Sequence, residues 1–78
     1  MRNKIFKNTS GTMIQFPQRL SDGFNWSPDE RIQINHKQDA YGEPGYVVLN
    51  IEYCGNYPAY ETAWISDKIL NNCFTETK

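Results

Sequence analysis

The chain has 78 residues, of which 38% are hydrophobic, and its 8 basic and 9 acidic side chains give a net charge of −1. Because so short a chain rarely divides into two cores, we expect a single domain over residues 1–78. No apolar run approaches the ~20 residues that span a bilayer, and no signal-peptide core follows the first residues. These features exclude a membrane-spanning class and predict a soluble, cytoplasmic protein.

Residues that usually carry chemistry are sparse. Cys54 and Cys73 lack the paired spacing of a zinc site, so we expect reduced thiols unless their Cα atoms lie within about 7 Å. His36 has no second histidine near it, and the adjacent carboxylates Asp29 and Glu30 point to opposite faces of an extended chain. No phosphate-binding loop or nucleophile motif occurs. The sequence predicts a non-enzymatic protein with no metal and no cofactor.

The kind of apolar residue favours strands. The chain contains 2 Trp, 5 Tyr, 4 Phe and 7 isoleucines but only 3 leucines and 3 alanines, a bias typical of pleated, half-buried surfaces. The predicted fold class is mainly β, a small antiparallel sheet with an N-terminal hairpin and a short C-terminal helical turn. An α+β arrangement is the alternative.

The N-terminal third should form a hairpin and a loop. Two short apolar runs at residues 4–6 and 12–16 flank a polar, glycine-containing segment, which predicts a hairpin. Pro17 lacks a ladder donor and turn residues follow it, so a loop completes residues 1–26. The aromatic rings of Phe24 and Trp26 either cap the core or face a partner.

A β core is predicted over residues 27–70. The segment 27–30 should be a single turn, because Ser27, Pro28 and Glu30 match a helix start but the chain then alternates apolar and polar residues. That alternation predicts a strand over residues 31–35, followed by a surface histidine, His36. Residues 37–45 form the clearest loop, with two glycines and a proline.

A second hairpin is predicted from residues 46–53 and 59–65, which both alternate apolar and polar side chains on either side of a Gly- and Pro-containing break. The core face of its first strand is expected to carry Val47, Leu49, Ile51 and Tyr53. Ser66 and Asp67 can cap a short helix in which Ile69 and Leu70 close the sheet. A polar tail is expected over residues 71–78.

Residues 30–70 resemble the SH3-like small β-barrels of bacterial and phage proteins. The resemblance rests on a first strand at 31–35, a long first loop, a strand led in by Gly45, a strand at 60–64 and a short turn ending at Leu70. It implies an SH3-like barrel that binds peptides, protein surfaces or nucleic acid through its first and middle loops. The positions that this points to are Tyr41, Tyr57, Tyr60 and Trp64.

Charge divides the chain and gives two hypotheses of function. Residues 22–78 carry 4 basic and 9 acidic groups, a balance of −5, which favours a protein partner with a basic surface. Tyrosine suits such a contact because its ring is large, rigid and able to hydrogen-bond. The expected protein-binding residues are Tyr41, Glu43, Glu52, Tyr57, Tyr60, Glu61 and Trp64. Asp39 is a further acidic candidate. By type, the chain resembles small phage-encoded inhibitors of bacterial machinery, including anti-defence proteins, that occlude a basic surface.

The alternative is a nucleic-acid-binding small barrel. Residues 1–21 carry four basic side chains and no acid, which could contact phosphates while an aromatic ring stacks on a base. The residues expected to do so are Arg2, Lys4, Lys7, Arg19 and Trp26, with Tyr41 as a second stacking ring. Either a monomer or a homodimer formed through an exposed strand edge is compatible with the sequence.

Overall fold

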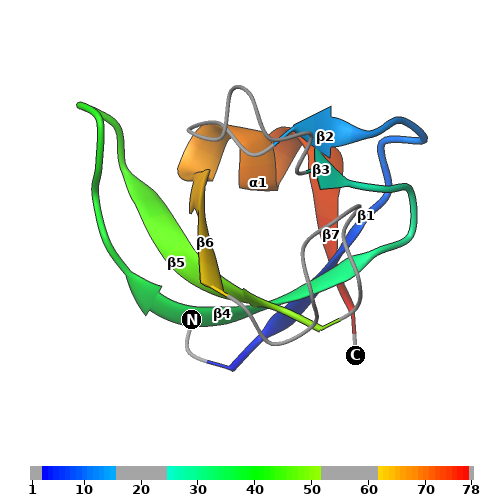
Figure 1. Ribbon diagram of the computed structural model, residues 1–78, viewed down its shortest axis with the longest axis horizontal. Coiled ribbons are helices and arrows are strands. Elements are labelled where there is room, and N and C mark those ends of the chain that lie inside the picture. Colours follow the sequence, from blue (N-terminus) through cyan, green and yellow to red (C-terminus); the bar gives the residue numbers. More distant parts are fainter. Residues whose placement is uncertain (1–2, 16–24, 52–61, 78) are drawn as a thin grey trace.

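The computed structural model describes residues 3–15, 25–51 and 62–77. Within these ranges the chain forms seven strands and one helix (Figure 1), and the protein is mainly β, as its composition predicts. In chain order the elements are β1 (Ile5–Asn8), β2 (Ile14–Gln15), β3 (Asn25–Trp26), β4 (Arg31–Lys37), β5 (Gly45–Asn50), β6 (Thr62–Ser66), α1 (Asp67–Cys73) and β7 (Phe74–Thr77).

Five strands form one antiparallel sheet in the order β6-β5-β4-β1-β7, and β2 pairs with β3 in a separate two-stranded sheet. The helix joins the edge strands β6 and β7 directly. Seven helical residues rise only about 10 Å, so the two edges must curve toward each other. Figure 1 shows this curvature, with α1 and the β2–β3 pair lying across the open side of the sheet.

The hydrophobic core fills the concave side of this sheet. Trp26 is fully buried there, and its ring meets the Phe74 ring edge-on with 5.6 Å between centroids. Its indole Nε1 donates to Oδ1 of the buried Asn50 at 2.8 Å, so the polar end of the largest core residue is satisfied. The core consists of Phe6, Trp26, Ile32, Ile34, Tyr46, Val48, Ile65, Leu70 and Phe74.

Several local expectations are confirmed. Residues 27–30 form one turn, in which the Ser27 amide donates to the Glu30 carboxylate and the Glu30 amide donates back to the Ser27 carbonyl. The strand expected at 31–35 is present and runs two residues further, so the exposed His36 lies inside β4. β5 and β6 pair as a hairpin, and the Ser66 hydroxyl caps α1 by accepting from the Ile69 amide.

The predicted N-terminal hairpin is wrong. β1 pairs with β4 on one side and β7 on the other, so both of its edges are occupied and β2 cannot join it. The polar segment after β1 is still a turn, with Gly11 at φ +81°, but it carries the chain toward β3 instead.

The predicted core face of β5 is also wrong. Tyr46, Val48 and Asn50 are buried, whereas Val47 and Leu49 lie on the opposite, outer face and are half-buried. Val48 and Asn50 stand opposite Ile34 and Ile32, which fixes their side of the sheet. Alternation along β5 separates two faces but does not say which one is buried. The face with Asn50 is the buried one, because the Asn50 side chain accepts a hydrogen bond from the buried indole of Trp26. Tyr53 lies outside the described residues.

The polar tail expected from Asn71 is replaced by structure. Asn71 to Cys73 complete α1, and β7 then pairs with β1 through four residue pairs from Phe74 to Thr77. The buried Phe74 ring anchors this strand to the core. The polar composition of the surrounding sequence does not predict such a strand.

The buried side chain of Asn8 connects the two sheets. At the end of β1, its Nδ2 donates to the carbonyls of Thr12, Trp26 and Ser27 at 2.9, 3.0 and 3.2 Å. Its Oδ1 accepts from both the amide and the hydroxyl of Ser10. One amide group therefore ties β1 to the following turn and to the end of β3.

Replacing Asn8 should destabilise the fold strongly. Asn8→Ala removes the buried amide and its hydrogen bonds to three carbonyls, and we expect a loss of about 3 kcal/mol in the free energy of unfolding, measured by urea denaturation. The matched control is Asn72→Ala, an exposed position in α1, which should stay within about 0.7 kcal/mol of the wild type. Equal effects of the two substitutions would contradict this role of Asn8.

Candidate functional site

The connection between β4 and β5 ends in a tight turn. Ala40 and Glu43 exchange two backbone hydrogen bonds, each 2.9 Å, across the two central residues Tyr41 and Gly42. Both central residues have positive φ, +55° and +76°, which defines a type I′ hairpin turn. Figure 1 shows this connection reaching away from the rest of the sheet.

Tyr41 occupies an unfavourable backbone conformation. The first central position of a type I′ turn normally holds asparagine, aspartate or glycine, because larger side chains clash with the backbone at positive φ. The other two non-glycine residues with positive φ in the described ranges are Asn3 and Asp29, the residue types that tolerate it. Tyr41 is the exception, and the residue is 69% exposed, so burial does not compensate for the strain.

Trp64 on β6 lies beside this turn in a fixed orientation. Its ring centroid is 5.6 Å from that of Tyr41, with 64° between the ring planes. Its Nε1 donates to the Gln38 carbonyl at 2.6 Å, which orients the indole. The ring lies against Gly45, where a Cβ would overlap it and the Ile65 carbonyl. Glycine is therefore required beneath the indole.

Apolar side chains continue from Trp64 along the outer face of the sheet. Val47 is directly opposite Trp64, and Leu49 is directly opposite Thr62, so these residues share the outer face. Both Val47 and Leu49 are half-buried. The exposed Tyr41 and the half-buried Trp64 thus form one end of a mainly apolar strip.

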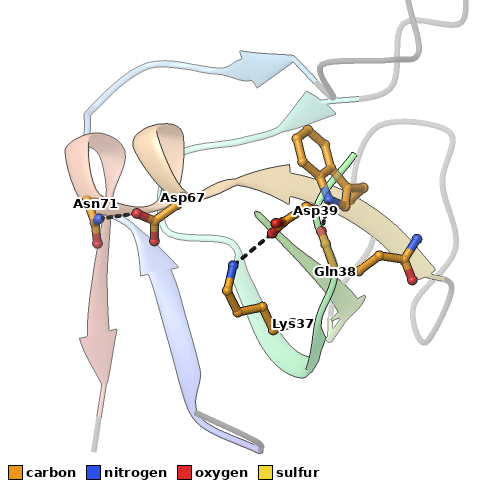
Figure 2. A network of polar contacts seen from close by, with 6 residues as sticks. Lys37, Gln38, Asp39, Asp67 and Asn71 are labelled. Atoms are coloured by element: carbon orange, nitrogen blue, oxygen red, sulfur yellow. Dashed lines mark hydrogen bonds and ion pairs between the residues drawn. The ribbon is translucent and has the colours of Figure 1, made fainter. Parts of the chain in front are cut away.

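An ion pair lies at the base of the same hairpin. Nζ of Lys37 lies 2.9 Å from Oδ1 of Asp39, an exposed contact visible in Figure 2, and 5.4 Å from the ring centroid of Tyr46. A register shift in β4 between Ile34 and His36 places Lys37 opposite Tyr46. The hydrogen bond to Lys37 lowers the pKa of Asp39, and the same bond raises the pKa of Lys37.

The structure brings together three of the residues predicted to bind protein. We call Tyr41, Glu43 and Trp64 the tip site, because Tyr41 contacts Trp64 and Glu43 closes the same four-residue turn. The four others, Glu52, Tyr57, Tyr60 and Glu61, lie outside the described residues.

Sequence reasoning missed the residues that support the tip site. Gln38 orients Trp64 through its backbone carbonyl, which no side-chain pattern can show. Gly45 was expected only to lead into a strand, yet it makes space for the indole. Gly42 was a usable signal, since a glycine at the centre of a short turn suggests positive φ.

The residues predicted to bind nucleic acid lie in different settings, as far as the structure describes them. Lys4 forms an ion pair with Glu76 at 3.6 Å, and Lys7 is half-buried on β1 opposite Arg31. Trp26 cannot stack on a base because it is fully buried, so that assignment is corrected in favour of the core. Arg2 and Arg19 lie outside the described residues.

The described ranges were also compared with the requirements of a metal site and of a membrane-spanning helix. They contain no group of three or more metal-ligating side chains, and no helix in them has the length and apolar character to cross a membrane. Cys73 is a free thiol that packs partly against the core, and Cys54 lies outside these ranges.

No protein-family model matches the chain, and no curated protein or solved structure matches it.

The Lys37–Asp39 pair gives a direct electrostatic test. Lys37→Gln should raise the pKa of Asp39 toward its ordinary value, measured by carbon-13 NMR titration of the side-chain carboxyl. Because the folded pKa is lowered, the pair stabilises the fold above the ordinary aspartate range, and this contribution is lost as pH falls through the lowered pKa. Lys68→Gln is the control and should leave the Asp39 titration unchanged. An unaltered Asp39 pKa in Lys37→Gln would contradict the pairing.

Proposed function

We propose that the protein is a non-enzymatic protein-binding domain that engages its partner through the tip site. The observation that carries this proposal is the strained, exposed Tyr41. A left-handed conformation costs a non-glycine residue about 1–2 kcal/mol, and asparagine would make the same turn at lower cost. Strain of this kind occurs preferentially at ligand-contacting positions.

The neighbouring geometry supports recognition. Trp64 is fixed by a hydrogen bond and by contact with Gly45, so little side-chain freedom remains to be lost on binding. Tyrosine and tryptophan are the residues most enriched where binding energy is concentrated. Val47 and Leu49 extend this contact area along the outer face.

Charge suggests the character of the partner. Residues 22–78 hold 9 of the chain's acidic groups against 4 basic ones. A partner with a basic surface would be attracted to this part of the chain. Binding that covers a functional surface of the partner would inhibit it, and a phage-type inhibitor of a bacterial defence or nucleic-acid-handling protein is the form of this proposal that we favour.

An SH3-like barrel is part of the same proposal. It is supported by the five-strand order, the long connection between β1 and β4, and the short helix that precedes the last strand. These features include β1 and β7, so the barrel would extend over more of the chain than the span of residues 30–70 that the sequence suggests.

Site-specific crosslinking tests the proposed function. A photo-crosslinking phenylalanine derivative is placed at Tyr41 in the full chain, and the protein is expressed in bacterial cells, irradiated and purified with nuclease treatment. We expect one protein partner to be crosslinked in a stoichiometric amount, because the Tyr41 side chain would lie in the interface.

The matched control places the same group at the exposed Asn72 in α1, where little crosslinking is expected. Crosslinking of the same protein with equal yield from both positions would show that contact at the tip is not specific. Recovery of nucleic acid without protein, lost as salt is raised, would instead favour the basic alternative.

A further inference from the structure

The hairpin already holds one cation between an aromatic ring and a carboxylate. Lys37 places its ammonium 2.9 Å from Asp39 and 5.4 Å from the Tyr46 ring centroid. Attraction to the negative face of a ring and to a carboxylate act together in such a contact. This pairing satisfies the charge of Asp39 within the chain.

The tip site also contains an aromatic ring and a carboxylate, those of Tyr41 and Glu43. The Tyr41 ring is exposed, and Glu43 follows it two positions later in the same turn. Within the described ranges, ion pairs join Lys4 to Glu76 and Lys37 to Asp39, and neither pair involves Glu43. The carboxylate of Glu43 is therefore the negative group at the tip that a partner can pair with.

We infer that the tip site receives an arginine side chain of the protein partner, an inference that rests on the proposed function. The guanidinium would lie over an exposed aromatic face and hydrogen-bond to Glu43. Arginine fits better than lysine because its plane stacks on a ring while its edge donates to a carboxylate.

The indole of Trp64 favours this arrangement. Its Nε1 is already committed to the Gln38 carbonyl, so it presents ring surface and does not compete with the guanidinium as a donor. Contact with Tyr41 also holds the two rings together. The tip therefore combines aromatic surface with one carboxylate, which suits a cation.

NMR titration of the full chain tests the inference. The probe is N-acetyl-arginine amide, compared with N-acetyl-citrulline amide, which has nearly the same shape without the charge. We expect the Trp64 indole N–H resonance to shift with arginine, with about 2- to 5-fold tighter binding than citrulline, and the preference to fall as salt rises. The buried Trp26 indole is an internal reference and should not move.

Two variants separate the contributions. Glu43→Gln should remove most of the preference for arginine over citrulline, whereas Tyr41→Phe keeps the aromatic face and should retain it. Equal shifts with the two probes, or no shift of Trp64 with either, would overturn the arginine inference.

Failure of this inference is distinguishable from failure of the proposed function. If crosslinking at Tyr41 captures a protein but citrulline matches arginine, the tip binds protein without an arginine anchor. If no protein is captured, the docking function is wrong whatever the free amino acid does.

Discussion

The buried amide of Asn8 holds the two sheets together, and the rest of the structure is arranged around it. β1 has a strand on each side, so the position of Asn8 is fixed by two ladders. From there its side chain reaches the turn after β1 and the carbonyls at the end of β3. Without this link, the two-residue strands β2 and β3 would have little to hold them against the large sheet, because an isolated pair of strands is marginal in water.

The same interior contacts determine which side of β5 faces outward. Asn8 holds the backbone at Trp26, and the indole of Trp26 in turn gives the buried Asn50 a partner. With Asn50 on the core face, alternation puts Gly45 and Val47 on the outer face, where Trp64 lies across from them. A slip of one residue would turn this face inward. The orientation of the exposed site thus depends on hydrogen bonds in the core.

The sequence pattern predicted those elements that interactions between residues close in sequence determine. The strand containing Ile32 and Ile34, the β5–β6 hairpin and the Ser66 cap all follow from neighbouring residues, and each is confirmed. The pairing of β1 could not be predicted in this way, because its partners β4 and β7 are distant in sequence. The core face of β5 was mistaken because Asn50 is buried by a bond to Trp26, 24 residues away.

The residues of the tip site could be predicted from the sequence, but the contacts between them could not. Tyr41, Glu43 and Trp64 were selected by residue type and position, but the contact between Tyr41 and Trp64 requires the β5–β6 register. The positive φ of Tyr41 runs against the preference of tyrosine, so residue type does not predict it. A conflict between local preference and observed conformation is where a functional constraint is expected.

We propose that Tyr41 is kept in the turn for binding, at a cost in the free energy of unfolding. The most direct test measures unfolding free energy and affinity for the crosslinked partner in Tyr41→Asn and Tyr41→Ala, which both lose the ring contact with Trp64. Because asparagine tolerates the turn, we predict that Tyr41→Asn is about 1 kcal/mol more stable than Tyr41→Ala, while both bind at least about tenfold more weakly than the wild type. Wild-type affinity in Tyr41→Asn would contradict a binding role of Tyr41, and lower stability of Tyr41→Asn than of Tyr41→Ala would contradict the strain at this position.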